Sequence, residues 1–347
     1  MMKALVLERY NRFEFKEVEK PEIEPDEVLV KVEAVGICGS DVHGMDGSTG
    51  RRQPPLIMGH EASGEITAIG SAVRNWNLGD RVTFDSTIYR LDDWYTRHGW
   101  YNLSDKRVVL GVSCDDYRRH GAFAEYVAVP QHILYRLPEK VSFTQAAMVE
   151  PVAVALHALS LGKPQVNDSV VVVGAGMIGL FVIQLLKVAG CGQIIAVDLD
   201  EDKLVLAAKL GATHCFISQV PGLNQEILEL TNGRGADQAY EAVGISETVQ
   251  LAIANVRKGG TVTLLGNLSP QIEFPLQSVV TRQIKVQGSC AICGEYPAVL
   301  DLIAAGKIDV DTLVSAEAAL SEGADWFNRL YSKEKGLVKI ILKPSQK

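Results

Sequence analysis

Two different patterns of hydrophobic positions follow one another along the chain, and the change comes near residue 143. Before it, short apolar runs are separated by Gly, Pro and Asp, which is typical of β-strands joined by turns. After it, short apolar runs alternate with helical segments, which is typical of a parallel sheet covered by helices. The sequence therefore predicts a β-rich part followed by an α/β part.

The expected strands of the β-rich part cover residues 4–7, 27–35, 62–69, 81–84 and 122–129. Those of the α/β part cover residues 170–173, 194–197, 214–217, 238–241, 262–265 and 284–287, with helices such as 178–189 and 203–210 between most of them. Six parallel strands are the number found in a doubly wound Rossmann sheet. A helix over 296–305 and a strand over 337–342 do not continue the alternation, and we expect them to return to the first part. Residues 91–106 lack clear periodicity and predict a long loop.

Length, charge and cysteine content limit the kinds of protein and of binding partner that fit this sequence. The 347 residues are enough for two domains, and 34 basic against 42 acidic side chains give a net charge of −8. This balance argues against nucleic acid and anionic membranes as partners. The apolar run after the first lysine is too short for a signal peptide, and six scattered cysteines do not form a disulfide framework. We expect a cytoplasmic protein with reduced thiols.

A Gly-x-Gly-x-x-Gly pattern directly follows the strand over 170–173 and opens a helix, which is the context of a dinucleotide site. Gly174 allows the tight turn, Gly176 lets the backbone approach the phosphates, and Gly179 allows the helix to pack on the strand. The helix N-terminus favours the pyrophosphate. Asp198 closes the next strand, where a carboxylate accepts hydrogen bonds from the ribose hydroxyls and repels a 2′-phosphate. The pattern predicts NAD rather than NADP.

The alternative for these residues is structural. The three glycines would then serve only a tight turn, and Asp198 would cap the following helix. For Lys203, a position beside the adenine and a solvated position on the helix are equally compatible with the sequence.

Candidate metal ligands lie in the β-rich part and at its end. Catalytic zinc uses three N, S or O ligands, and Cys38, His60 and a carboxylate from Glu61 or Glu150 meet that need. Without further context, Cys38 and His60 would be ordinary core residues. Glu150 precedes Pro151, which favours an extended backbone at Glu150 and a helix that begins at the proline. A carboxylate beside a buried helix requires a partner, and the metal region is a candidate.

Four segments carry a resemblance to a known family. Residues 59–73 begin Gly-His-Glu-Ala-Ser-Gly, residues 36–43 read Gly-Ile-Cys-Gly-Ser-Asp-Val-His, residues 79–82 read Gly-Asp-Arg-Val, and residues 232–244 run from Asn-Gly-Arg-Gly to Ala-Val-Gly. In this order they resemble the motifs of the zinc-containing medium-chain alcohol dehydrogenases, over essentially the whole chain. The resemblance implies a GroES-like catalytic domain of residues 1–154 and 289–347, with a Rossmann NAD-binding domain of residues 155–288 inserted in it.

The resemblance also implies roles for individual residues. Cys38 and His60 would bind zinc, with Glu61 or Glu150 as third ligand. In the sorbitol dehydrogenase branch the glutamate after the histidine binds zinc, and the one that Glu150 matches reaches the metal through its water. Ser40 would relay the proton of the substrate hydroxyl and His43 would pass it towards solvent, whereas a turn serine and a surface imidazole are the structural alternatives.

Further positions follow from the same resemblance. Met177, Ile178, Leu265, Gly266 and Asn267 fall where the family contacts the pyrophosphate and the nicotinamide. Many relatives hold a structural zinc with four cysteines, and the matching positions here are Arg90, Asp93, Thr96 and Ser104. We therefore expect one catalytic zinc per chain and no structural zinc. The family is usually dimeric or tetrameric, which predicts a homodimer or homotetramer.

The implied activity is the reversible oxidation of a secondary alcohol of a polyol, sugar or sugar phosphate, with hydride transfer to NAD. Residues 150–157 are similar to the sorbitol and butanediol dehydrogenase branches, and L-threonine 3-dehydrogenases are near neighbours. Ala291 and Ile292 replace the arginine and tyrosine that anchor polyols, while Arg51 and Arg52 either bind a substrate phosphate or are solvated. Alternatives from other classes are a zinc-free quinone reductase that uses NADPH and a redox-inactive binding protein on the same fold.

Overall fold

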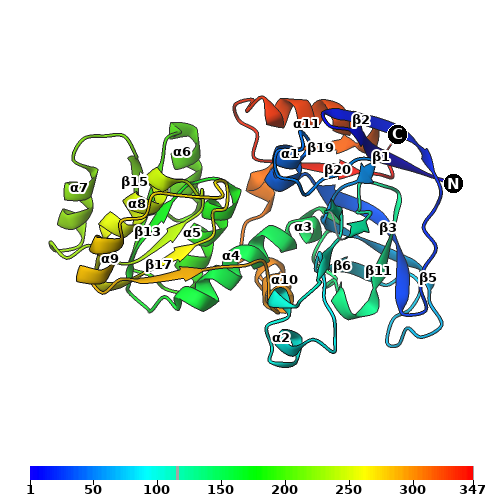
Figure 1. The fold of residues 1–347 in the computed structure, drawn as a ribbon, viewed down its shortest axis with the longest axis horizontal. Helices are drawn as coiled ribbons and strands as arrows, with labels where there is room; N and C mark the ends of the chain where they lie inside the picture. The colour runs from blue at the N-terminus through cyan, green and yellow to red at the C-terminus, as the bar shows by residue number, and fades with distance from the viewer. Residues whose placement is uncertain (115–116, 347) are drawn as a thin grey trace. The chain divides into compact units, whose positions relative to one another are not determined.

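The computed structural model describes residues 1–114 and 117–346, and these residues form two compact units. One unit contains Met1–Glu150, Tyr296–Gly306 and Val310–Lys347, and the other contains Pro151–Glu295 and Lys307–Asp309. The predicted domain limits after residues 154 and 288 stay predictions. A β-rich unit and a unit with a parallel sheet confirm the predicted α/β fold class (Figure 1).

The first unit is organised around one long buried strand, β3 (Glu27–Gly36). Its sheet has the strand order β12 (Leu134–Arg136), β6 (Arg81–Phe84), β5 (Glu61–Ile69), β3, β20 (Lys339–Lys343) and β19 (Val314–Ala319), and β11 (Tyr126–Pro130) also pairs with β3. A smaller sheet joins β2 (Arg12–Val18), β1 (Met2–Arg9) and β4 (Leu56–Ile57). The β-branched residues Val28, Val30 and Val32 are fully buried in the core between these elements.

Strand pairing places three chain segments at one edge of this sheet. The antiparallel register of β3 and β5 sets Gly36 opposite Glu61, and the register of β3 and β20 sets Gly36 opposite Ile341. The end of β3, the start of β5 and the start of β20 therefore meet. A Cβ atom at Gly36 would lie 2.5 Å from Glu61 Oε2, so the missing side chain leaves room for that carboxylate.

Short elements complete the first unit. They are α1 (Gly39–Gly44), β7 (Thr87–Ile88), α2 (Trp94–Arg97), η1 (Tyr101–Leu103), β8 (Val108–Val109), β9 (Val112–Ser113), β10 (Arg118–Arg119), η2 (Gln131–Ile133), α3 (Phe143–Ala147), α10 (Tyr296–Ala304), η3 (Asp311–Leu313), η4 (Leu320–Glu322) and α11 (Gly323–Tyr331). The expected helix over 296–305 and strand over 337–342 correspond to α10 and β20.

The second unit contains the parallel sheet. Its order is β15 (His214–Ile217), β14 (Gln193–Asp198), β13 (Ser169–Val173), β16 (Ala236–Glu241), β17 (Val256–Leu264) and β18 (Lys285–Gly288). All six expected strands are confirmed within the described residues, although β17 begins earlier than the apolar pattern predicts. Strand order reverses direction beside β13, which is the position where doubly wound sheets bind ligands.

Helices connect these strands: α4 (Val149–Gly162) precedes β13, and α5 (Met177–Val188), α6 (Glu201–Leu210), α7 (Leu223–Leu230), α8 (Ser246–Asn255) and α9 (Leu276–Thr281) follow in turn. Because parallel crossovers are right-handed, α5 and α6 lie on one face of the sheet and α8 and α9 on the other (Figure 1). The buried amide of Gln184 in α5 exchanges two hydrogen bonds with the backbone of Asp309, at 3.0 and 2.7 Å. This contact attaches residues 307–309 to the second unit.

The apolar run that ends in α5 is a buried strand and helix of the second unit. Within residues 1–114 and 117–346, no helix combines the length and the apolar character that a membrane crossing requires.

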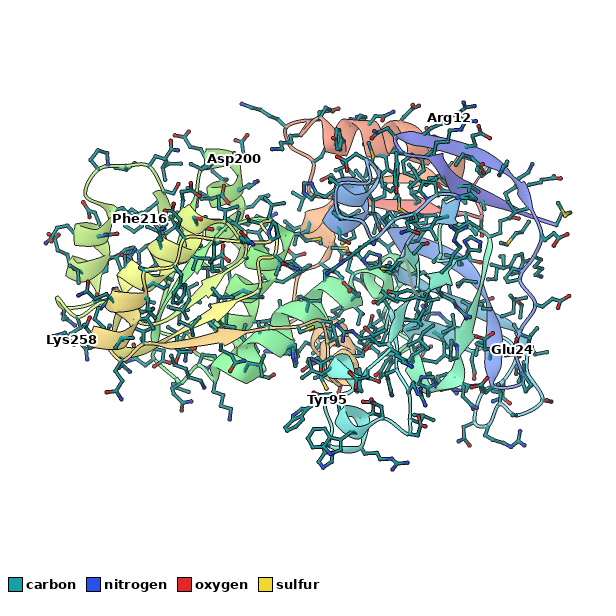
Figure 2. All side chains as sticks on the ribbon, in the orientation of Figure 1. Arg12, Glu24, Tyr95, Asp200, Phe216 and Lys258 are labelled. Carbon is teal, nitrogen blue, oxygen red and sulfur yellow. The ribbon has the colours of Figure 1, made fainter. Side chains whose placement is uncertain are left out.

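Residues 91–106, expected as a long loop, contain the short helices α2 and η1 and an aromatic surface. Trp94 stacks on His98 with 4.0 Å between the ring centroids, and Tyr95, labelled in Figure 2, lies against Trp94. Asp93 caps α2 by accepting from the N–H groups of Tyr95 and Thr96, and its other oxygen accepts from Asp105 N–H at 3.2 Å. Periodicity missed these elements because each is only about one turn long, and α2 depends on its side-chain cap Asp93.

The positions that match the four cysteines of relatives therefore take part in hydrogen bonding here. Asp93 joins α2 to residue 105, and Ser104 Oγ accepts from Arg90 N–H at 3.3 Å. These two side chains connect the beginning and the end of the segment, which is the task that a metal with ligands at both ends would perform.

Asp93→Ala should loosen this segment locally. Loss of the helix cap costs about 1 kcal/mol, so the amides of Tyr95, Thr96 and Asp105 should exchange roughly fivefold faster in native-state hydrogen exchange. Asp92→Ala is the matched control, because within residues 1–114 and 117–346 the exposed Asp92 side chain hydrogen-bonds only with Arg90. Equal exchange rates in the two variants would contradict the structural role of Asp93.

Candidate functional site

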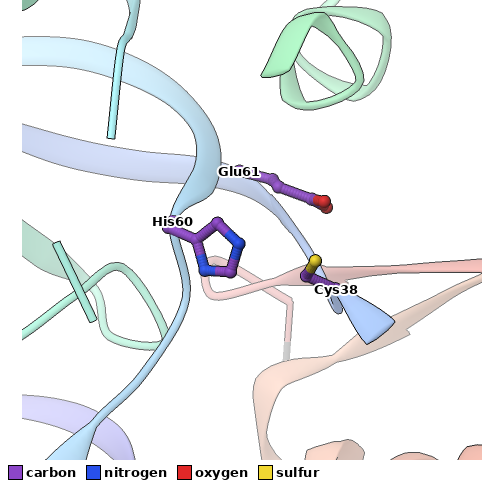
Figure 3. A group of neighbouring side chains, drawn as sticks. All are labelled: Cys38, His60 and Glu61. Atoms are coloured by element: carbon purple, nitrogen blue, oxygen red, sulfur yellow. The ribbon is translucent and has the colours of Figure 1, made fainter. Parts of the chain in front are cut away.

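Cys38, His60 and Glu61 converge at the sheet edge where β3 ends and β5 begins (Figure 3). One ligand atom from each lies within 4.8 Å of the other two: the sulfur, a ring nitrogen and a carboxylate oxygen. Cys38 also caps α1, since its Sγ accepts from Ser40 N–H at 3.4 Å. Two of the predicted ligands are neighbours in sequence, and strand pairing brings the third to them.

Glu61 is completely buried and is paired on one side only. Its Oε2 accepts from Lys339 Nζ at 2.5 Å, while Lys339, with 0% exposure, also donates to Ile37 O at 3.0 Å. Among the described residues Glu61 Oε1 has no hydrogen-bond partner. A buried carboxylate oxygen without a donor is costly, and a bound cation would satisfy it.

Asp41 lies behind His60. Its Oδ2 is 3.4 Å from His60 Nδ1, within ion-pair distance but without hydrogen-bond geometry, and its Oδ1 accepts from Arg52. Burial opposes ionisation of Asp41, yet His60 and Arg52 lower its pKa to about 2. Burial would also lower the pKa of His60, but the negative charges of Asp41 and Cys38 raise it well above its ordinary value. The negative charges of Asp41 and Cys38 thus favour a positive charge at the position of His60.

These observations test whether the residues fit a zinc ion. Thiolate, imidazole and carboxylate are the ligand types of zinc, and three protein ligands are the number found at catalytic sites. The unpartnered Glu61 Oε1 and the negative surroundings of His60 both call for a cation between these side chains. The donor set fits zinc.

Glu150 is not part of the three-residue cluster. Contrary to the expected extended backbone, it lies in the first turn of α4, which begins at Val149, before Pro151. A proline is tolerated there because the first N–H groups of a helix have no intrahelical partner. Desolvation raises the pKa of the half-buried Glu150 to about 8, and the charges of Glu61 and Asp85 add to the effect while His60 and Lys339 oppose it.

Ser40 reaches the cluster, whereas His43 does not. Ser40 Oγ donates to Cys38 Sγ at 3.3 Å and accepts from Arg52 Nη2 at 3.3 Å. His43 is exposed in the last turn of α1, and in the part of the chain that the structure describes no hydrogen bond joins it to Ser40.

The glycine-rich turn has the geometry that the pattern predicts. Gly174 has a φ of 96°, which favours glycine, and Gly176 is the N-cap of α5. A Cβ atom at Gly179 would lie 1.8 Å from Gly174 O, so only glycine allows the helix this close to the strand. Met177 and Ile178 form the first residues of α5.

Asp198 supports this turn from the end of β14. Its Oδ2 accepts from Ala175 N–H at 2.7 Å, its Oδ1 accepts from Asp200 N–H at 3.0 Å, and Lys203 Nζ lies 3.9 Å away. The suggestion that Asp198 caps the next helix is wrong, because Asp200 is the N-cap of α6 (Figure 2). Lys203 is half exposed beside the carboxylate.

A second turn at the same edge of the parallel sheet contains Leu265, Gly266 and Asn267, directly after β17. Gly266 lies against the backbone of Gly244, since a Cβ atom there would be 2.1 Å from Gly244 N. Glu241, a residue without a predicted role, holds the facing turn by accepting from the N–H groups of Val243 and Gly244, both at 2.8 Å. The predicted cofactor residues thus lie at the carboxyl ends of β13, β14 and β17, where such sheets bind nucleotides.

Two charged residues of the metal region had no predicted role, and a third, Arg52, had a different one. A lysine within the apolar run over 337–342 was the available signal for Lys339, because a charge in a buried strand requires a partner. Asp41 lies inside a quoted motif but had no predicted role. Arg52 is neither solvated nor free for a phosphate: it is 4% exposed and paired with Asp41.

Comparison with known proteins agrees with this geometry. The alcohol dehydrogenase GroES-like domain family matches residues 24–139, and the zinc-binding dehydrogenase family matches residues 178–305. The sorbitol dehydrogenase of Bacillus subtilis (strain 168) is 33% identical over 99% of this chain and 98% of its own. The D-arabitol-phosphate dehydrogenase of Enterococcus avium is 30% identical, and the match covers 97% of this chain and 96% of that enzyme.

Among solved structures, a zinc-binding dehydrogenase of Sinorhizobium meliloti 1021 bound to NADP has a TM-score of 0.91 and 32% identity, and the match covers 99% of each chain. The resemblance seen in the motifs is confirmed. The chain belongs to the zinc-containing medium-chain alcohol dehydrogenases, enzymes that use zinc and a nicotinamide cofactor.

Proposed function

We propose that this enzyme reversibly oxidises a secondary alcohol of a polyol, sugar or sugar phosphate to the ketone, with one zinc ion per chain and NAD. The observation that carries the proposal is the cluster of half-buried Cys38 with buried His60 and Glu61, in which Glu61 Oε1 has no partner among the described residues. The names of two full-length relatives, a sorbitol and a D-arabitol-phosphate dehydrogenase, support the substrate class.

Cys38, His60 and Glu61 would hold the zinc. Once bound, zinc supplies a Lewis acid that lowers the pKa of an alcohol oxygen. Lys339 keeps one oxygen of Glu61 engaged, so that the other is available as a ligand. We assign the direct ligand to Glu61 rather than Glu150, because only Glu61 belongs to the three-residue cluster.

The remaining polar groups would handle the proton. Ser40 Oγ lies beside Cys38 Sγ, where it can accept the proton of the substrate hydroxyl, and His43 at the exposed end of α1 can pass it to solvent. Glu150, whose pKa of about 8 is close to physiological pH, can hold or release a proton at the same end of the sheet.

We propose NAD as the cofactor because the end of β14 is strongly acidic. Asp198 lies where the ribose would bind, and Asp200, Glu201 and Asp202 follow it. A 2′-phosphate would meet these like charges. The similar Sinorhizobium enzyme was solved with NADP, so cofactor preference is part of the test.

The substrate within this class depends on the two arginines and on the missing polyol anchor. Arg52 is committed to Asp41, which leaves Arg51 as the exposed arginine of the pair for a phosphate. Ala291 and Ile292 offer no polar side chain in place of the anchor. Butanediol and L-threonine dehydrogenases, sibling branches of the family, are the alternatives.

The activity test measures NADH and NADPH formation by the zinc-loaded enzyme with polyols, aldoses, their phosphates, vicinal diols and threonine. We expect turnover confined to polyols, sugars or their phosphates, with NAD preferred by at least tenfold. If only diols or only threonine react, the sibling assignment replaces ours. No turnover on any compound by enzyme with bound zinc and NAD would refute the proposed function.

The ligand assignment predicts different effects of two matched substitutions. Glu61→Gln should weaken zinc binding at least tenfold in competition with a chelator, because an amide is a poorer zinc ligand than a carboxylate. Glu150→Gln should retain one zinc per chain and change the dependence of kcat on pH near 8. The reverse pattern, with zinc lost only from Glu150→Gln, would make Glu150 the ligand.

We also propose that the enzyme forms a homodimer or homotetramer through the α9 region, next to the edge strand β18. Leu276 and Val280 in α9 are 64% and 68% exposed, which is unusual for two apolar residues one turn apart. Light scattering should give the mass of a dimer or tetramer, and Leu276→Asp with Val280→Asp should reduce it. Val205→Asp, at an equally exposed position on α6, is the control and should leave the mass unchanged.

A further inference from the structure

Arg52 is a buried cation that contacts two partners of the metal cluster at once. Its Nε and Nη2 donate to Asp41 Oδ1 at 3.0 and 2.8 Å, and Nη2 also donates to Ser40 Oγ at 3.3 Å. Its Nη1 donates to the carbonyl of Arg51 at 3.0 Å. Each of the three guanidinium nitrogens is therefore engaged in at least one hydrogen bond within the protein.

The partners of Arg52 each face a candidate zinc ligand. Asp41 Oδ2, the oxygen that Arg52 does not bind, lies 3.4 Å from His60 Nδ1. Ser40 Oγ, which accepts from Arg52, donates to Cys38 Sγ at 3.3 Å. The Arg52 guanidinium thus contacts Asp41, which lies next to His60, and Ser40, which lies next to Cys38.

Two neighbouring features, a glycine in α1 and a β-bridge, fix the position of Arg52. A Cβ atom at Gly44 would lie 2.5 Å from Arg52 Cγ, so α1 makes room for the arginine stem with a glycine. A β-bridge between Arg52 and Ser113 fixes the backbone. Neighbouring Arg51, in contrast, is exposed, and within residues 1–114 and 117–346 its side chain has no hydrogen-bond partner.

We propose that Arg52 is a positioning residue of the metal centre, which orients His60 through Asp41 and Cys38 through Ser40. The inference rests on the proposed zinc site. With two N–H groups on Oδ1, the Asp41 carboxylate is locked so that Oδ2 faces Nδ1 of His60. That oxygen favours a proton on Nδ1 and leaves the Nε2 lone pair for the metal. Donation to Ser40 Oγ occupies one of its two lone pairs and directs the hydroxyl proton to the Cys38 sulfur, while the second lone pair can accept from the substrate hydroxyl.

An ammonium group cannot replace the guanidinium fully. Lysine supplies a charge that can pair with Asp41, but it lacks the planar fork that reaches Asp41 and Ser40 together. The order expected for zinc affinity is therefore wild type, then Arg52→Lys, then Arg52→Gln.

The test compares Arg52→Gln and Arg52→Lys with Arg51→Gln as the matched control in the full-length protein. Competition with a chromogenic chelator should show zinc binding weakened 10- to 100-fold in Arg52→Gln, as for other residues that orient metal ligands. Arg52→Lys should recover part of this loss, and Arg51→Gln should stay within twofold of wild type. In Co²⁺-substituted protein, the thiolate-to-cobalt absorption band should shift in Arg52→Gln and remain in Arg51→Gln.

Several results would overturn the proposal. Equal zinc affinity in Arg52→Gln and Arg51→Gln would do so, as would a raised KM for phosphorylated substrates with zinc binding unchanged, which would make Arg52 a substrate anchor. A lowered melting temperature with normal zinc affinity of the folded protein would make its role purely structural. If wild type itself bound no zinc through Cys38 and His60, the proposed function would fail before this inference.

Gly44→Ala is the second variant in case Arg52→Gln does not fold. The new methyl group displaces the stem of Arg52 without removing its charge. We expect weaker zinc binding with the same shift of the cobalt band, and unchanged zinc binding would count against the proposal.

Discussion

Charged groups are buried at one edge of the central sheet of the first unit, and the metal site depends on how their charges are paired. Glu61 and Lys339 are both fully buried, as is Asp41, which pairs with Arg52. Removing one member of such a pair costs about 3–5 kcal/mol because the other is left as an uncompensated charge. Each pair therefore holds its carboxylate in one place, and each leaves a second oxygen without a hydrogen-bond partner among the described residues.

Those two free oxygens face the same region. Glu61 Oε1 is part of a carboxylate of the ligand cluster, and Asp41 Oδ2 lies 3.4 Å from Nδ1 of His60. The cations Lys339 and Arg52 thus neutralise part of the negative charge, while enough remains to attract a divalent ion. Such pairing would position the ligands of the proposed site before a metal ion binds.

In the second unit, the candidate cofactor site is formed mainly by backbone groups of two tight turns. Its turns after β13 and β17 are close packed through Gly179 and Gly266, and the carboxylates of Asp198 and Glu241 hold the turns by accepting from N–H groups. Backbone donors at the start of α5 are left for an anionic ligand, which suits a pyrophosphate. Asp198 supports the glycine-rich turn and, in the proposed cofactor site, would also give the ribose region its negative charge.

The amino-acid sequence alone determined the elements and motifs whose cause is local. Periodicity of apolar residues identified the parallel strands, and glycine spacing identified the nucleotide turn, because both reflect short-range backbone geometry. Cys38, His60 and Glu61 were also recognisable from sequence, through the resemblance of their motifs. The start of α4 at Val149 rather than at Pro151 and the cap of α2 by Asp93 were not, since a helix end and a single turn are decided by neighbours in space.

Only the tertiary structure decided which charges meet. Lys339 is paired with Glu61, 278 positions earlier in the chain, because β20 lies beside β3. Arg51 and Arg52 are adjacent residues of the same type, so the sequence alone does not distinguish them. The fold around Gly44 and Asp41 buries Arg52 and leaves Arg51 exposed. Burial and pairing of charges depend on which distant strands lie next to each other in the sheet. The local pattern of residues does not determine these neighbours.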